Sequence, residues 1–407
     1  MSTGAFLHPY AKPTRPDSEY IRIVRGRGAR VWDDRGNEYI DAMASLWYAN
    51  VGYGRDEITA AVTAQMNDIA AFHCFDPFSN VPAERLAERI RGLAPVPESR
   101  VFFTSSGSEA VDSAMKLARI AHVRAGRPER TIIVSRSRAY HGVTYGGLSA
   151  QGLPANQEGF GPFVADTVNI PADDIEAMAA FMSEHGERVA AIMSEPVQGA
   201  GGVYPPHEGY LAGLRRLADQ HGCYLIFDEV ICAFGRLGHW FSAGHFGVTP
   251  DISTFAKAVT SGYVPLGGVV LAPHVSAALE SDPAWMLRHG HTYSGHPTAC
   301  AAAQANLDIL HGEALLARAP HIGDRLFGAF ASLAADGLIA EVRREVAVGA
   351  TRLAEGLDAF AVRDRLLGGG VITRAVNPET LTWCPPLVIS DDEIDTVVDQ
   401  FERALRA

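Results

Sequence analysis

The sequence predicts an α/β protein with a mostly parallel central sheet, helices on both faces of that sheet, and a smaller α+β domain. Two observations lead to this prediction. Short apolar runs with strand composition alternate with amphipathic helical segments between about residues 100 and 310, as in sheets whose strands are joined by right-handed helical crossovers. The 407 residues also exceed what one ordinary hydrophobic core contains, which favours two domains.

The first part of the chain predicts small strands and then helices. Residues 1–20 are proline-rich and polar, which favours an extended arm. Apolar and β-branched residues predict short strands, and a turn at 33–37 separates the strand 29–32 from the strand 39–41. After residue 55, apolar residues recur with helical periodicity, and a strand pattern appears at 100–104. The expected strands are 20–24, 29–32, 39–41 and 100–104, and the expected helices are 56–70, 83–93 and about 107–124.

The rest of the chain continues the alternation and then changes character after residue 312. Strands are expected at 131–135, 189–194, 223–227, 251–256 and 265–271, with helices at 205–220 and 298–310. A long helix, short strands near 338–348, a helix near 357–367 and a strand at 381–384 follow. The last helix begins at a capping box, Ser390-Asp391-Asp392-Glu393. We expect residues 1–50 and 312–407 to form the small domain and residues 51–311 the large one.

Two strand ends carry candidate catalytic side chains. Asp228 follows the apolar run 223–227, and Lys257 follows the run 251–256. Ligands of open α/β sheets bind outside the carboxyl ends of the strands, so both side chains are expected in one crevice. An amine and a carboxylate placed together suggest a lysine that forms a Schiff base and an acid that tunes a cofactor's ring nitrogen.

The small number of lysines singles out Lys257. The chain contains only three lysines, and arginine otherwise supplies the positive charge; arginine remains protonated and forms no Schiff base. Lys12 lies in the proline-bearing arm, and Lys116 lies within a helix where a solvated position is the ordinary expectation. A solvated or salt-bridged lysine is the alternative for Lys257 as well, but its apolar, strand-terminal setting argues against it.

Composition excludes several classes of protein. The net charge of −12 argues against general binding to nucleic acid or to an anionic membrane. The five cysteines are scattered without a Cys-x-x-Cys motif, which indicates reduced thiols in a cytoplasmic protein. The first nine residues lack a basic segment and an apolar segment, so no signal peptide is expected. No apolar run approaches the roughly 20 residues of a membrane span.

Three further segments have features of a ligand site, each with an ordinary alternative. Residues 105–110 join a strand to a helix through serines and a glycine, which suits a phosphate site but also an ordinary helix cap. Tyr140 leaves a strand beside His141 and could stack on a planar ligand, whereas His141 alone could be structural. The aromatic segment 43–54 is either a pocket wall or packing. His289, His291 and His296 lack a nearby acidic partner, so we expect a polar loop touching cofactor or partner subunit, not a metal site.

Together these segments resemble the class III aminotransferases, which are pyridoxal-phosphate enzymes of fold type I. The resemblance covers about residues 29–310 and resumes at 368–389. The motifs that carry it are Ser105-Ser106-Gly107-Ser108-Glu109-Ala110, Tyr140-His141-Gly142, Glu195-Pro196-Val197-Gln198-Gly199-Ala200-Gly201-Gly202, Phe227-Asp228-Glu229-Val230, Phe255-Ala256-Lys257 and His291-Thr292-Tyr293-Ser294-Gly295-His296-Pro297. Residues 342–349 depart from the glycine-punctuated run that the family has there.

The resemblance implies roles for these residues. Lys257 matches the Schiff-base lysine that also moves the substrate proton, and Asp228 matches the acid that keeps the pyridine nitrogen protonated. Thr292 matches a threonine that reaches the phosphate of the neighbouring subunit, which implies a homodimer with shared sites and leaves a tetramer open. The other implied cofactor-binding residues are Ser106, Gly107, Ser108, Tyr140, His141, Glu195 and Val230.

Within the family, the chain resembles the ω-amino-acid and amine:pyruvate transaminases. In that branch Trp47 would line the substrate pocket, and Arg374 would bind an α-carboxylate and swing away for plain amines. A surface ion pair is the alternative for Arg374. The implied activity is ping-pong transfer of an amino group from an amine or ω-amino acid to a keto acid such as pyruvate. The alternatives are a diaminopelargonate-type transaminase that uses S-adenosylmethionine, a racemase or decarboxylase of the same fold, and a non-catalytic protein that binds pyridoxal phosphate.

Overall fold

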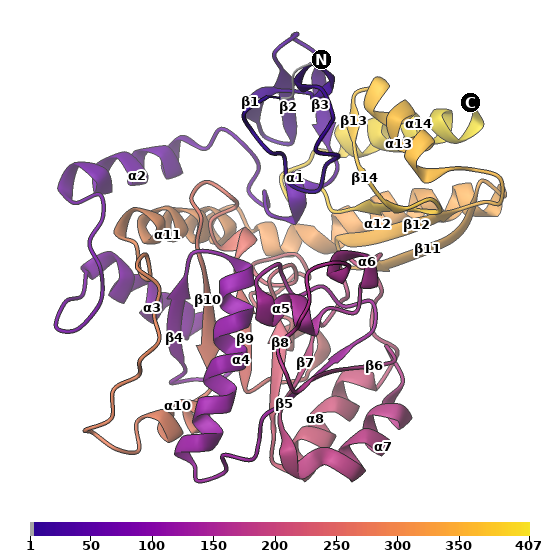
Figure 1. Ribbon diagram of the computed structural model, residues 1–407. Coiled ribbons are helices and arrows are strands. Elements are labelled where there is room, and N and C mark those ends of the chain that lie inside the picture. Colours follow the sequence, from indigo (N-terminus) through magenta and orange to yellow (C-terminus); the bar gives the residue numbers. More distant parts are fainter. Residues whose placement is uncertain (1–3) are drawn as a thin grey trace.

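The computed structural model describes residues 4–407. Residues 1–3, which begin the segment where no signal peptide is expected, lie outside the described residues. Figure 1 shows a large sheet with its helices in the lower half of the view, and a smaller region above it that holds both chain ends. Within residues 4–407 no helix is both long enough and apolar enough to cross a membrane.

The N-terminal strands form a four-stranded sheet with a strand from the other end of the chain. Its order is β1-β2-β3-β13, and β13 lies parallel to β3. The strands are β1 (Ile23–Arg27), β2 (Arg30–Asp33), β3 (Glu38–Asp41) and β13 (Val371–Ile372). This pairing places β3 beside β13, and the division into two domains stays a prediction.

The large sheet has seven strands in the order β4-β10-β9-β8-β7-β5-β6. β10 alone runs in the opposite direction to the other strands. The predicted mostly parallel sheet is therefore confirmed. Its strands are β4 (Arg100–Thr104), β5 (Ile132–Arg136), β6 (Thr167–Ile170), β7 (Val189–Ser194), β8 (Tyr224–Asp228), β9 (Ile252–Phe255) and β10 (Gly267–Leu271). The prediction omitted β6 because two apolar residues in a four-residue edge strand give little periodic signal.

Alternate side chains of the large sheet pack on opposite faces. On β5, Ile133 belongs to an apolar cluster with Ala114 of α4 (Gly107–Arg124). Its neighbours Ile132 and Val134 belong to a second cluster with Met178 of α7 (Ile175–His185). Strand side chains alternate with a period of two, so the sheet is covered by helices on both faces, as the sequence predicts.

Most of the helices predicted before residue 313 lie close to their expected ranges, and the clearest difference is at the start of the helix predicted at 205–220. The predicted start at residue 205 is wrong, because α8 begins at Tyr210, after Gly209 at φ 76°. Pro205 and Pro206 lie before it, outside any helix, strand or turn. Besides α4 and α7, the helices up to residue 312 are α1 (Ala44–Trp47), α2 (Asp56–Asp68), α3 (Val81–Leu93), α5 (Tyr145–Ala150), α6 (Pro154–Gln157), α8 (Tyr210–His221), α9 (Ala243–Phe246), α10 (Pro273–Leu279) and α11 (Pro297–Gly312). Within residues 4–407, short 3₁₀ turns lie at Asp17–Glu19, Gly186–Arg188 and Lys257–Val259.

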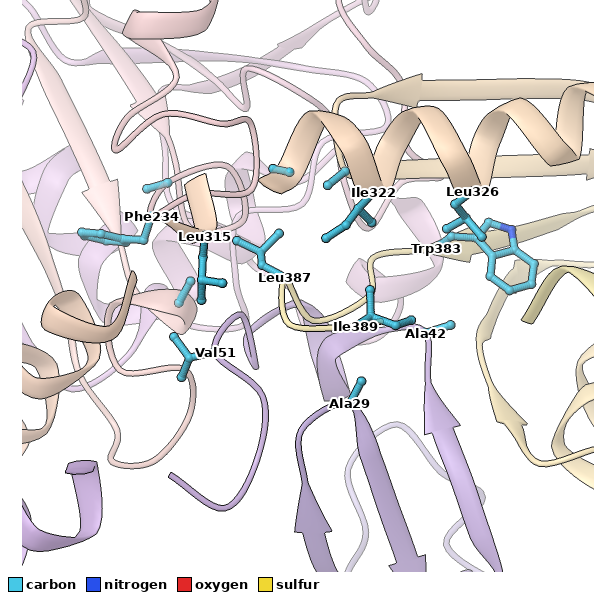
Figure 2. Close-up of a cluster of buried hydrophobic side chains, with 14 of the residues drawn as sticks. Ala29, Ala42, Val51, Phe234, Leu315, Ile322, Leu326, Trp383, Leu387 and Ile389 are labelled. Atoms are coloured by element: carbon cyan, nitrogen blue, oxygen red, sulfur yellow. The ribbon is translucent and has the colours of Figure 1, made fainter. Parts of the chain in front are cut away.

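The C-terminal part contains a second four-stranded sheet, ordered β11-β12-β15-β14, with three helices. The capping box predicted at Ser390 is present at the start of the last helix. In Figure 2 the buried side chains of Leu326 and Trp383 lie beside each other, and Ala29 and Val51 of the N-terminal segment join the same cluster. The elements are α12 (Leu315–Ala335), β11 (Ile339–Glu345), β12 (Val348–Leu353), α13 (Ala359–Gly368), β14 (Arg374–Asn377), β15 (Thr380–Trp383) and α14 (Asp391–Arg406).

Candidate active site

A cavity of about 150 Å³ lies at the carboxyl ends of β7 and β8. Nine side chains or backbone positions that the sequence singles out lie in its wall, although they come from segments up to 150 residues apart. The lining residues are Ser106, Gly107, Ser108, Val111, Tyr140, His141, Gly142, Glu195, Asp228, Val230, Ile231 and Lys257.

Lys257 enters the cavity directly after β9. Its φ of 46° lies in the left-handed region, which costs a residue other than glycine free energy and is concentrated at functional sites. Burial lowers the pKa of Lys257, while Asp228 and Glu195 oppose this shift. The amine is therefore easier to deprotonate than an ordinary lysine, which makes it a better nucleophile.

Asp228 ends β8, and its carboxylate is held on both oxygens. Oδ2 lies 2.8 Å from Nδ1 of His141, and Oδ1 accepts hydrogen bonds from Thr254 Oγ1 at 3.1 Å and from Val230 N at 3.2 Å. Nε2 of His141 lies 3.1 Å from Ser135 Oγ. These contacts hold the carboxylate of Asp228 in a fixed orientation in the cavity wall.

Glu195 follows β7 and fixes the backbone around Tyr140. Its two oxygens accept hydrogen bonds from Tyr140 N and Gly199 N, both at 2.9 Å. Burial raises the pKa of Glu195, although these donors oppose the shift. Glu195 therefore joins two loops of the cavity wall, those that contain Tyr140 and Gly199.

The turn before α4 forms a narrow backbone cradle. Ser106 caps α4, and its side chain accepts a hydrogen bond from Glu109 N at 3.2 Å. A Cβ on Gly107 would lie 3.0 Å from Val230 Cγ1, so a side chain there would crowd the cavity. The N-terminus of an 18-residue helix presents free N–H groups and a partial positive charge, the features that bind phosphate.

Comparison with known proteins decides the family. The class III aminotransferase family model matches residues 12–405. The chain is a class III aminotransferase.

This aminotransferase is similar to characterised relatives over its whole length. It is 33% identical to a putrescine–pyruvate aminotransferase of Pseudomonas aeruginosa, covering 100% of this chain and 95% of the relative. It is 35% identical to an omega-aminotransferase of Caulobacter vibrioides, covering 98% and 97%. The crystal structure of a PLP-bound amine transaminase from an uncultivated Pseudomonas species superposes with a TM-score of 0.94 at 32% identity, over 100% and 99% of the two chains. The fold is that of the type I pyridoxal-phosphate transaminases.

Class III aminotransferases use pyridoxal phosphate, and the residues of the cavity fit this cofactor. The cavity combines a buried amine on Lys257, an anionic carboxylate on Asp228 and a helix N-terminus at Gly107. These three groups match, in that order, an aldehyde, a basic ring nitrogen and a phosphate. No side chain of the lining conflicts with any of the three.

Three predicted site residues lie outside the cavity wall of this aminotransferase. Trp47 is 3% exposed and packs in a buried cluster that includes the lining residue Ile231. Arg374 begins β14, and its charge lies near enough to Tyr140 to oppose the rise in the pKa of that phenol. Thr292 is exposed on the loop before α11, where it does not contribute to the cavity of its own chain.

Sequence reasoning missed several residues of the aminotransferase site, including Val111 of α4. Thr254 stands directly opposite Asp228 in the parallel pairing of β8 and β9, so register was the signal that could have located it. Ser135 is fully buried near the end of β5 beneath His141. Ile231 lines the cavity one residue beyond the predicted Val230. For Ser135 and Ile231 the sequence has no comparable local signal.

Proposed function

We propose that this aminotransferase moves an amino group from an amine or ω-amino acid to pyruvate by a ping-pong mechanism. The observation that carries the proposal is the meeting of Lys257, Asp228 and the Gly107 turn in one cavity. Two relatives that share nearly the whole chain, a putrescine–pyruvate and an omega-aminotransferase, support the substrate class.

Pyridoxal phosphate, when bound, withdraws electrons from the carbon that carries the substrate amine. Lys257 would bind the cofactor covalently and, once displaced by the substrate, would move a proton at the substrate's α-carbon with its readily deprotonated amine. Asp228 would keep a proton on the pyridine nitrogen. The backbone N–H groups at residues 106–108 would hold the phosphate, and Tyr140 and Val230 would confine the ring between them.

Arg374 and Trp47 are the proposed substrate-binding residues. The Arg374 guanidinium makes no ion pair and no side-chain hydrogen bond within residues 4–407, so it is available to an α-carboxylate. Its charge faces Tyr140 at the cavity opening. Trp47, packed behind Ile231, would limit the size of the substrate side chain.

We further propose a cytoplasmic homodimer in which Thr292 of each copy contacts the phosphate site of the other. Large apolar side chains near that loop remain exposed, namely Phe75 at 50%, Phe78 at 49% and Tyr293 at 63%. A gathering of such side chains marks an interaction surface. All five cysteines are free, which suits a reducing compartment. The mass of the purified protein in solution tests the dimer.

The function is tested by assaying holoenzyme with a panel of donors, among them putrescine, β-alanine, 1-phenylethylamine and S-adenosylmethionine. Pyruvate and 2-oxoglutarate serve as acceptors, and the amino-acid product is measured. Alanine formed from pyruvate with an amine donor is the expected result. Use of S-adenosylmethionine as the only donor would favour the diaminopelargonate-type alternative. Release of carbon dioxide would favour a decarboxylase, and racemised substrate would favour a racemase.

The covalent role of Lys257 is tested separately. Borohydride reduction of holoenzyme should attach the cofactor to the peptide that contains Lys257. Lys257→Ala should abolish both this attachment and turnover, whereas Lys12→Ala, on the exposed arm, should change neither. Attachment to another residue would refute the assignment.

A further inference from the structure

The loop that carries Thr292 is fastened to α4 through one serine. Ser113 is fully buried in the middle of α4. Its Oγ lies 2.9 Å from Nε2 of His289 and 3.3 Å from Nε2 of His291. His289 also stacks on Phe102, with ring centroids 5.2 Å apart. One hydroxyl therefore contacts both histidines that flank Gly290.

The protonation of His289 follows from its neighbours. Lys116 Nζ lies 2.9 Å from Nδ1 of His289, and an ammonium group only donates hydrogen bonds, so Nδ1 is the acceptor. Burial and the charge of Lys116 lower the pKa of His289 to about 4, against a small opposing effect of Asp112. His289 is therefore neutral near pH 7, with its proton on Nε2, and donates to Ser113.

The same hydroxyl can then serve His291 as well. Since Ser113 Oγ accepts from His289, its own proton is free for Nε2 of His291. Nδ1 of His291 lies 3.9 Å from Glu109 Oε1. Glu109 Oε2 in turn accepts a hydrogen bond from Ser105 N at 2.7 Å. The Ser113 hydroxyl is thus a shared contact of His289 and His291, and Lys116 contacts the other ring nitrogen of His289.

The rest of the loop is anchored as well, except at its tip. Ser294 Oγ donates to Phe103 O at 2.7 Å, and Asn80 Nδ2 donates to Gly295 O at 2.8 Å. The side chains of Thr292 and Tyr293 are exposed and make no hydrogen bond within residues 4–407. A rigid base thus presents an outward-facing tip.

We propose that Ser113, His289 and His291 are positioning residues that hold Thr292 for the cofactor site of a second copy of the chain. The inference rests on the proposed function, specifically on the contact of Thr292 with the neighbouring phosphate site. It predicts an effect in trans: a change at Ser113 weakens cofactor binding in the other subunit and not in its own. A merely structural role of Ser113 would act on both sites or on its own site.

The test uses two heterodimers made from differently tagged chains that are co-expressed and purified over both tags. In the first, one chain carries Lys257→Ala and Ser113→Ala, and the other is wild-type. The remaining Lys257 site then faces the altered loop, and we expect its cofactor to dissociate about tenfold faster, because a hydrogen bond to a charged group is weakened. Dissociation is followed by the absorbance of the lysine-linked cofactor.

In the second heterodimer, one chain carries Lys257→Ala and the other carries Ser113→Ala. The remaining Lys257 site now shares a chain with the altered serine but faces an unaltered loop. We expect dissociation at the rate of the reference heterodimer, which pairs Lys257→Ala with wild-type. Equal acceleration in both heterodimers, acceleration only in the second, or acceleration in neither would overturn the inference.

Thr292→Val in the same two arrangements provides the matched variant and should reproduce the effect in trans. If Thr292→Val changes neither rate, the inference is also overturned, while transamination by the wild-type enzyme would leave the proposed function intact. Should Ser113→Ala fail to fold, His289→Phe replaces it, because phenylalanine keeps the stack on Phe102 and removes both ring nitrogens. Failure of the proposed function is distinct, since wild-type protein would then form no alanine from pyruvate with an amine donor, whatever the dissociation rates.

Discussion

Nδ1 of His141 lies 2.8 Å from Oδ2 of Asp228, and both side chains are buried. The same histidine contacts Ser135 through its other nitrogen, which fixes the ring in place. A buried carboxylate whose donors are held in this way needs little rearrangement when charge develops in the site. Asp228 is thus held by His141, which is itself held by Ser135.

Removing His141 should therefore slow catalysis more than it weakens substrate binding. A hydrogen bond to a charged group is worth about 1.5–3 kcal/mol, so kcat of His141→Ala should fall about ten- to a hundredfold. Steady-state kinetics with a saturating donor measure this effect. His185→Ala, on the outer helix α7, is the control, and an unchanged kcat in His141→Ala would contradict the role given to this contact.

Arg374→Ala should distinguish substrates with and without an α-carboxylate. Loss of a charge-assisted pair predicts that KM for pyruvate rises about tenfold or more, while KM for an amine without a carboxylate changes little. Arg352→Ala is the matched control, because Arg352 lies in the same sheet and pairs with Glu341 at 3.2 Å. Equal increases for both substrates would indicate that Arg374 has only a structural role.

Glu229 should make stability depend on pH. Burial raises the pKa of Glu229 from 4.5 to about 7. The folded state then holds the proton more tightly than the unfolded state, so the stabilisation is complete below about pH 4.5 and is lost as pH rises through about 7. Above pH 8, this difference between the two pKa values of Glu229 lowers the free energy of unfolding by about 3 kcal/mol relative to its value at low pH.

Glu229→Gln removes this titration and keeps an oxygen for the hydrogen bond from Ser242 N. We expect wild-type and variant to be similarly stable at pH 5, and the variant to be more stable at pH 8.5 by up to about 3 kcal/mol. Urea unfolding of the two proteins at both pH values measures the difference. A constant difference across pH would show that Glu229 does not titrate between the two states.

Ser390→Ala should weaken the last helix without affecting the site. Ser390 and Glu393 exchange hydrogen bonds in a capping box, at 3.2 Å and 2.9 Å. Loss of such a cap costs about 1 kcal/mol of unfolding free energy. Thr396→Ala, at an exposed position of the same helix, is expected to change stability less. Denaturant unfolding checks this, and a Ser390→Ala variant as stable as Thr396→Ala would contradict the prediction.

The site was predictable from sequence where chemistry and local pattern coincide. Lys257 and Asp228 each follow an apolar strand, and parallel strands end at the same edge of a sheet, so their meeting followed from two local signals. Residues without such a signal were not found. Ser135 is an ordinary strand residue until the fold places it 3.1 Å from His141.

The boundaries of elements were less predictable than their existence. The helix expected from residue 205 begins at Tyr210, because the two prolines and Gly209 set a turn that an amphipathic pattern does not reveal. The strand β6 is an edge strand with a weak pattern. In both cases the surroundings, and not the local period, determine the structure.

The sequence by itself determined the α/β alternation, the large parallel sheet and the two chemical groups at its edge, since each depends on residues that are close in the chain. Only the tertiary structure decided which partners surround those groups. Ser113 lies 176 residues from His289, and Asp228 lies 87 residues from His141. Contacts of this kind depend on how distant segments pack, because a hydrogen bond requires atoms about 3 Å apart, a distance that no local pattern specifies.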